Sequence, residues 1–154
     1  PVVLAPVSLG WSVNWVNQGN TMDKAIKDAN TSGIAPQEFI EGKWNRRPST
    51  YKPGWQDEAK KFRPIEWWDI DCYGRNVEKT IGQCLAVLSV GRPIYVGYNW
   101  WGHAVECVGM QWDAKQPNGI VWIIQNSHND GIIKLTGSKG IPSEAYAIRA
   151  TSIG

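Results

Sequence analysis

The chain has 154 residues and a net charge of +2, and ten of its residues are tryptophan. This length allows one domain with a sizeable core, and so small a charge argues against nucleic acid or an anionic membrane as a partner. No apolar run is long enough to span a membrane and no signal peptide is visible, although a start at Pro1 points to processing or to a fragment.

Helices are predicted for the first part of the chain. Residues 7–16 are expected to form a short helix after an initial loop. Asn20 or Thr21 then caps a helix that runs to about Asn30 and ends at Gly33, the usual residue type after a helix C-terminus. The apolar positions of this second helix recur at helical spacing: Met22, Ala25, Ile26 and Ala29.

Residues 34–64 are expected to be irregular because they contain four prolines, with a short helix over 55–62. The basic residues of this region suit either an anion site or a solvated surface loop: Lys43, Arg46 and Arg47. A strand is predicted over 65–71. Trp67 and Trp68 must face opposite ways in that strand, so that one of them lies in the core.

The second half contains one helix followed by strands. Asn76 is expected to cap a helix that ends before the Gly-Arg-Pro sequence at 91–93, since proline cannot continue a helix. The apolar positions of this helix are Val77, Ile81, Cys84, Leu85 and Leu88. Strands are predicted over 94–98, 103–112, 120–126, 132–135 and 145–149. The order indicates an α+β fold, with helices packed against a C-terminal antiparallel sheet or partial barrel.

The most informative residues are His103 and Asn126. A turn at 116–119 would join the strands over 103–112 and 120–126 into a hairpin, which places the start of one beside the end of the other. An amide oxygen that holds an imidazole fixes the tautomer that a general base needs. The alternative is a histidine bonded to the backbone and a strand-end asparagine bonded to its own backbone.

The residues just before the histidine favour the functional interpretation. Gly102 would allow another group to approach closely, and the Trp100–Trp101 pair would form one wall of a cleft.

A metal site is a competing interpretation of the same segment. His103 and Cys107 lie about 13 Å apart along a strand, too far to share one ion. His128 and Asp130 could join His103, but the spacing of these residues does not define a three-ligand metal site. No metal and no cofactor are therefore expected.

A His–Asn pair implies a thiol nucleophile, yet none of the three cysteines suits that role. Cys84 lies on the apolar stripe of a helix, and Cys107 is in mid-strand, far from His103. Cys72 follows acidic residues, which would raise the pKa of its thiol. All three are expected to be buried free thiols. Their odd number and wide spacing favour a reducing compartment such as the cytoplasm, and nothing else indicates a location.

The order of these motifs resembles the papain family of cysteine peptidases through most of the chain. His103-Ala104-Val105 with Val108-Gly109 matches the family's "HAV-x-x-VG", and residues 122–127 match its "W-x-x-K-NSW". Four other segments resemble family motifs: residues 4–9 "LSEQ-x-L", 19–34 "GG-x-x-x-x-A-(helix)-x-GI", 78–93 the helix before "GP-V-x-V", and 131–135 "GY-x-x-I".

The resemblance implies a thiol peptidase that hydrolyses a peptide or protein substrate. It implies that His103 is the general base and acid, that Asn126 orients it, and that Ala104 lies near the pocket for the substrate's second side chain, with Trp101 and Gly102 beside it. It also implies a single papain-like domain over 1–154, in which 1–64 are the remainder of a helical lobe and 65–154 a β-rich lobe with one helix.

The chain departs from the family at two places. The family's nucleophilic cysteine and oxyanion-hole glutamine precede its "LSEQ" stretch, which begins here at Leu4, so we expect a truncated chain that is inactive alone. His128 stands where the family has a tryptophan that shields the His–Asn bond from water. With the disulfide cysteines of secreted members also missing, a divergent bacterial or phage-type member is expected.

Two other functions remain open. One is a cell-wall amidase or endopeptidase of the phage-lysin type, since a tryptophan-lined cleft suits stacking on glycans. The other is a non-catalytic papain-like pseudoenzyme or binding module, which the missing nucleophile and His128 favour. No phosphate-loop pattern is present, which argues against a transferase that uses nucleotides.

Overall fold

The computed structural model describes residues 4, 21–40, 48–72, 76–126 and 131–150. These residues belong to two compact units. The first holds the residues up to Glu66 together with Arg149 and Ala150, and the second is Trp67–Ile148. The boundary lies close to the predicted lobe boundary after residue 64, and a single papain-like domain stays a prediction. The predicted helix over 7–16 and the basic cluster lie outside the described residues.

The first unit contains helix α2, Met22–Ser32, as predicted. Its N-terminus is capped by the Thr21 hydroxyl, which accepts a hydrogen bond from the Lys24 backbone N–H at 3.4 Å. Gly33 follows it with φ of 77° and donates its N–H to the carbonyl of Ala29. The buried residues of α2 all belong to the predicted apolar stripe: Met22, Ile26 and Ala29.

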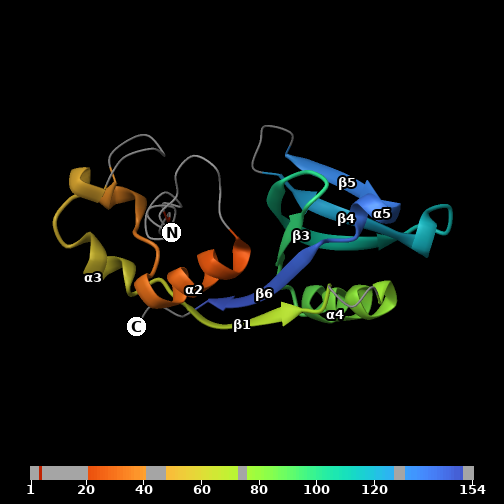
Figure 1. The fold of residues 1–154 in the computed structure, drawn as a ribbon, viewed down its shortest axis with the longest axis horizontal. Helices are drawn as coiled ribbons and strands as arrows, with labels where there is room; N and C mark the ends of the chain where they lie inside the picture. The colour runs from red at the N-terminus through yellow and green to blue at the C-terminus, as the bar shows by residue number, and fades with distance from the viewer. Residues whose placement is uncertain (1–3, 5–20, 41–47, 73–75, 127–130, 151–154) are drawn as a thin grey trace. The chain divides into compact units, whose positions relative to one another are not determined.

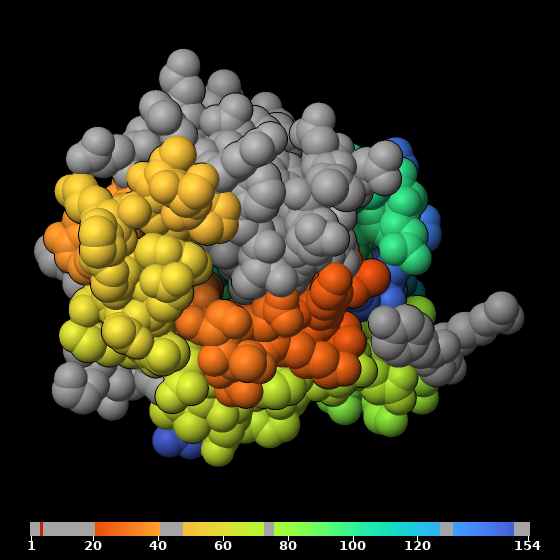
Figure 2. Space-filling model, turned by 60° about the vertical axis from the view of Figure 1, so that its left-hand side comes forward, coloured from red at the N-terminus to blue at the C-terminus, as the bar shows by residue number. Residues whose placement is uncertain are grey.

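The rest of the first unit is irregular, as predicted, with two 3-10 turns at Gln37–Phe39 and Pro48–Thr50 and a short helix α3 at Trp55–Ala59. Its small core consists of Ala35, Ile40, Tyr51 and Ala59, with Phe39 and Trp55 packed against it. The Ile34 N–H donates to the Phe62 carbonyl at 3.1 Å, and this bond joins the end of α2 to the segment after α3. Figure 2 shows α2 in orange beside the yellow residues of this segment.

A six-stranded sheet has the strand order β1-β6-β2-β3-β4-β5. The strands are β1 Pro64–Ile70, β2 Ile94–Tyr98, β3 His103–Trp112, β4 Ile120–Gln125, β5 Ile132–Thr136 and β6 Glu144–Ala150. The pairs from β6 to β5 are all antiparallel, so the α+β prediction is confirmed. None of the helices among the described residues has the length and apolar character that a membrane crossing requires.

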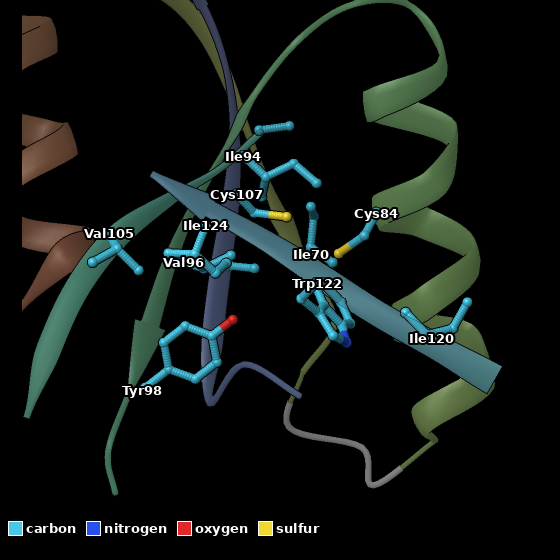
Figure 3. Close-up of a cluster of buried hydrophobic side chains, with 12 residues drawn as sticks. Ile70, Cys84, Ile94, Val96, Tyr98, Val105, Cys107, Ile120, Trp122 and Ile124 are labelled. Carbon is cyan, nitrogen blue, oxygen red and sulfur yellow. The ribbon is translucent and has the colours of Figure 1, made fainter. Parts of the chain in front are cut away.

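Helix α4, Val77–Ser89, covers one face of the sheet (Figure 1). The Asn76 side chain caps it by accepting the Lys79 N–H at 3.0 Å, as predicted. Cys84 on α4 is fully buried, and Figure 3 shows its sulfur directed toward the strands. The strands supply most of the core on this face: Ile94, Val96, Tyr98, Val105, Cys107, Ile120, Trp122, Ile124, Ala145 and Ala147. A short helix α5, Gly137–Gly140, was not predicted.

A β-bulge in β3 controls which side chains reach this core. Cys107 pairs with Ile124, whereas Gly109 pairs with Ile123, so the register shifts at Val108. Without the shift, alternation would turn Met110 away from the face that carries Cys107. With it, Met110 also packs against the core cluster, and Val108 is left 42% exposed.

The expectation that one of two neighbouring tryptophans lies in the core was wrong. Trp67 is half-buried and Trp68 is 46% exposed. Their strand, β1, ends the strand order and therefore has a neighbour on one side alone. Ile70, at the end of β1, is its contribution to the main core cluster.

The turn that leads into β3 requires a glycine at position 102. Gly102 has φ of 62°, in the left-handed region, and its N–H donates to the Tyr98 carbonyl at 2.8 Å. A Cβ atom added there would meet no atom within 4 Å. The positive φ is therefore sufficient reason for a glycine here, and the close approach of another group to Gly102 stays a prediction.

Gly102→Ala should lower the free energy of unfolding by about 1 kcal/mol, because a side chain is strained at this φ. Gly82→Ala is the matched control. Gly82 lies in α4 with open space around it, so alanine there should raise stability by about 0.5–1 kcal/mol. Urea unfolding followed by circular dichroism measures both, and equal effects of the two changes would contradict this assignment.

Candidate active site

His103 is the first residue of strand β3, and its backbone is fixed by pairing with β2 and by the turn that precedes it. It pairs with Tyr98 of β2 across the turn, and the bonds of that turn fix the backbone at Gly102. Its side chain is half-buried. His103, Val105 and Cys107 alternate along β3 with residues on the other face, so the imidazole lies at the end of the row that forms the core.

Asn126 lies one residue beyond the end of β4 and is 5% exposed. Its N–H donates to the carbonyl of Gly131 at 2.8 Å, which fixes the backbone where the strand ends. The turn predicted at 116–119 joins β3 and β4, with Asn118 and Gly119 at φ of 63° and 67°. The predicted hairpin thus brings the two candidate residues to the same end of the sheet.

The two side chains meet in a hydrogen bond. The His103 Nε2 and Asn126 Oδ1 atoms are 3.1 Å apart. An amide oxygen can only accept, so Nε2 carries the proton in this arrangement and Nδ1 is the ring nitrogen with a lone pair. The pair therefore selects the tautomer in which Nδ1 can take a proton from a reacting group.

Aromatic rings lie directly beside the imidazole. The Trp101 ring meets the His103 ring edge to face, with centroids 4.8 Å apart and planes at 69°. Trp100 stacks on Trp101 with centroids 5.5 Å apart and planes at 13°. Trp100 is 48% exposed, whereas Trp101 is half-buried against the core. The sequence placed this pair near the site, but contact with the histidine depends on how the turn folds and was not predicted.

Ala104 and Gly102 flank the histidine in the chain. Ala104 is half-buried and pairs with Gly97 of β2, and alternation turns its side chain to the sheet face opposite His103. Gly102 is exposed. That either residue contacts substrate stays a prediction.

The three cysteines have free thiols whose environment suppresses reactivity. Burial raises the pKa of Cys84 to about 12 and that of Cys107 to about 11. Burial also raises the pKa of Cys72 to about 12, and the nearby Asp69, Asp71 and Glu144 add to the rise. The thiolate is the reactive form, so none of these cysteines is suited to be a nucleophile at neutral pH.

No group of three or more His, Cys, Asp or Glu side chains that could hold a metal ion occurs within the described part of the chain. His128 and Asp130, which sequence analysis weighed as partners of His103, lie outside it. A cavity of about 780 Å³ opens elsewhere in the second unit, between α4 and the β3–β4 turn. Its lining includes Leu85 and Trp112 but no residue of the His–Asn pair.

Comparison with known proteins gives a match in structure and none in sequence. No family model and no characterised relative matches the sequence. The fold is similar to digestive procathepsin L 3 of the Tenebrio molitor larval midgut, with a TM-score of 0.66 and 16% identity over 96% of this chain and 56% of that one. It is also similar to xylellain, a cysteine protease from Xylella fastidiosa, with a TM-score of 0.61 and 16% identity over 95% and 69%. A cysteine protease of Carica candamarcensis matches with a TM-score of 0.60 and 16% identity over 96% and 78%.

These likenesses confirm the predicted papain-like fold. The 154 residues span 56% of the procathepsin chain, so a substantial part of that protein has no counterpart here. At 16% identity the likeness extends to the fold alone.

Alkylation of the thiols tests the description of the cysteines. At pH 8 each thiol of the folded protein should react with iodoacetamide more than about tenfold more slowly than the same thiol in urea, because so little thiolate is present. Raising the pH from 8 to 10 should accelerate labelling of the unfolded chain about tenfold, because a thiol with a pKa near 9.0 is then almost fully ionised. The folded thiols, with pKa values of about 11 or 12, should accelerate up to about a hundredfold and still react more slowly than the unfolded ones. Peptide mapping by mass spectrometry resolves the sites. A cysteine that reacts equally fast in both states would be a candidate nucleophile after all.

Proposed function

We propose that this chain is part of a papain-like thiol peptidase that cleaves peptide bonds by Cys-His-Asn chemistry. The supporting observation is the 3.1 Å hydrogen bond between His103 Nε2 and Asn126 Oδ1, at the end of a sheet in a papain-like fold. His103 would act as general base and then as general acid, and Asn126 would hold its ring. The substrate would be a peptide or protein, with Ala104 and Gly102 near its binding pocket.

The chemistry follows from the lone pair that this tautomer places on Nδ1. Nδ1 of His103 takes the proton of a cysteine thiol, and the sulfur attacks the carbonyl carbon of the peptide bond. The C–N bond breaks as the imidazolium returns the proton to the leaving amine. Water, deprotonated by the same nitrogen, then hydrolyses the thioester and restores the thiol.

The thiol must come from a segment outside these residues. Cys72, Cys84 and Cys107 are unsuited to be the nucleophile, because burial raises the pKa of each thiol and two of them are fully buried. The 154 residues alone should therefore be inactive. A divergent bacterial or phage-type origin stays a proposal, as does a location in a reducing compartment.

Substitution of the pair in the complete protein tests this proposal. His103→Ala should lower kcat on a peptide substrate by about 10²–10⁴-fold, the usual contribution of a general acid–base. Asn126→Ala should lower kcat by about a hundredfold with little change in KM, because the ring loses its orientation. Asn99→Ala, an exposed asparagine in the β2–β3 turn, is the control and should retain activity. Undiminished activity of His103→Ala would refute the proposed role.

A second candidate is hydrolysis of an amide bond in the cell wall. The observation that favours it is the half-exposed Trp100, stacked on the tryptophan that touches His103, since aromatic rings beside a reacting centre suit glycan-linked peptides. Zymography of the complete protein on cell walls and on casein separates the two substrates. Lack of activity on both, with no cysteine at the start of a helix elsewhere in the protein, would indicate a pseudoenzyme or binding module.

A further inference from the structure

The half-buried Trp101 makes its closest aromatic contact with His103 and not with another tryptophan. The centroid distance is 4.8 Å to the imidazole and 5.5 Å to the ring of Trp100. Edge-to-face packing at this distance is a favourable arrangement of two aromatic rings. It restricts rotation of the imidazole, because a turned ring would lose the contact or collide with the indole.

Trp101 is itself held in place by its neighbours. Trp100 stacks on it, and the Lys139 ammonium lies 5.3 Å from the centroid of the Trp100 ring, a cation–π contact. Lys139 belongs to α5, which Tyr98 anchors by donating its hydroxyl to the Gly140 carbonyl at 3.2 Å. Four side chains therefore form a continuous row of contacts, which we call the aromatic row: Lys139, Trp100, Trp101 and His103.

The backbone at the other end of the row is fixed as well. The N–H groups of Trp101 and Gly102 both donate to the Tyr98 carbonyl, at 3.0 and 2.8 Å. The rings of Tyr98 and Trp101 are 6.4 Å apart, and Tyr98 itself is buried in the core. The indole of Trp101 thus connects a rigid turn and a packed core to the imidazole.

We propose that Trp101 is a positioning residue that holds the His103 ring in its hydrogen bond to Asn126 and keeps water from that bond, with Trp100 and Lys139 keeping Trp101 in place. The effect of this positioning on catalysis rests on the role proposed for His103. The positioning itself does not, since it concerns only the orientation and water access of the imidazole ring. A residue with this role acts through the histidine, whereas a pocket residue would contact the substrate.

The Nε2 proton of His103 gives a direct readout. Its exchange rate with water can be measured by NMR in the complete protein labelled with nitrogen-15 histidine, and its signal is identified by its loss in His103→Gln. In Trp101→Ala the exchange rate should rise about tenfold, because the edge-to-face contact and its shielding are lost. Trp101→Phe keeps an aromatic ring and should stay close to the wild type.

Two further variants keep the test decisive. Trp112→Ala is the matched control: Trp112 ends the same strand, is 71% exposed and should leave the exchange rate unchanged. Trp100→Ala removes an exposed ring and should give a smaller rise than Trp101→Ala, which tests the row even if the latter does not fold. An unchanged rate in folded Trp101→Ala, or in Trp100→Ala if only that variant folds, would overturn the proposal. A rise of equal size in Trp112→Ala would overturn it too.

Kinetics of the same variants separate this inference from the proposed function. If Trp101 positions the histidine, Trp101→Phe should keep kcat and Trp101→Ala should lower it with little change in KM. A rise in KM at unchanged kcat would show a substrate-pocket residue and overturn the positioning role. Faster proton exchange in Trp101→Ala together with full activity of His103→Ala would leave the ring contact established and refute the peptidase mechanism alone.

Discussion

The antiparallel pairing of β3 with β4 is the constraint on which the candidate site depends. It brings the first residue of one strand and the residue after the other to the same end of the sheet, where His103 and Asn126 meet at 3.1 Å. A slip of one residue would turn one partner to the opposite face. The turn at 117–119 and the bulge at Val108 fix this register, and the bulge also lets both halves of β3 contribute to the core.

The core-facing side chains of the hairpin formed by β3 and β4 therefore contribute both to the core and to the candidate site. In the middle of the hairpin, side chains including Cys107 are buried and pack against α4. Burial there raises the pKa of the thiols and makes them unreactive. At the end of this hairpin lie the half-buried His103 and the buried Asn126, whose side chains are joined by a hydrogen bond. The candidate base and the residue proposed to orient it are therefore present, whereas none of the three cysteines is a suitable thiol. This agrees with a chain that spans 56% of the procathepsin to which it is similar in fold.

Local signals in the sequence predicted most of the fold. The bounds of β2 and β3 agree with the prediction, and the caps at Thr21 and Asn76 were identified, because alternation and capping depend on neighbours in the chain. The hairpin also predicted the proximity of the candidate pair. The exposure of Trp68 depends on the edge position of its strand, which distant residues determine, and the contact of Trp101 with the histidine depends on how the turn between β2 and β3 folds. Neither was predictable. Helix α5 has no apolar periodicity to reveal it.

The proposed chemistry depends on Asn126 fixing the tautomer of His103 so that Nδ1 can accept a proton. The most direct measurement is a long-range proton–nitrogen correlation spectrum of the neutral histidine ring, in the wild type and in Asn126→Ala. The wild-type ring should be protonated on Nε2 and show the chemical shift of an unprotonated nitrogen at Nδ1, and removal of the amide oxygen should produce a mixture of tautomers. A wild-type ring protonated on Nδ1, or a spectrum that Asn126→Ala leaves unchanged, would contradict this proposal.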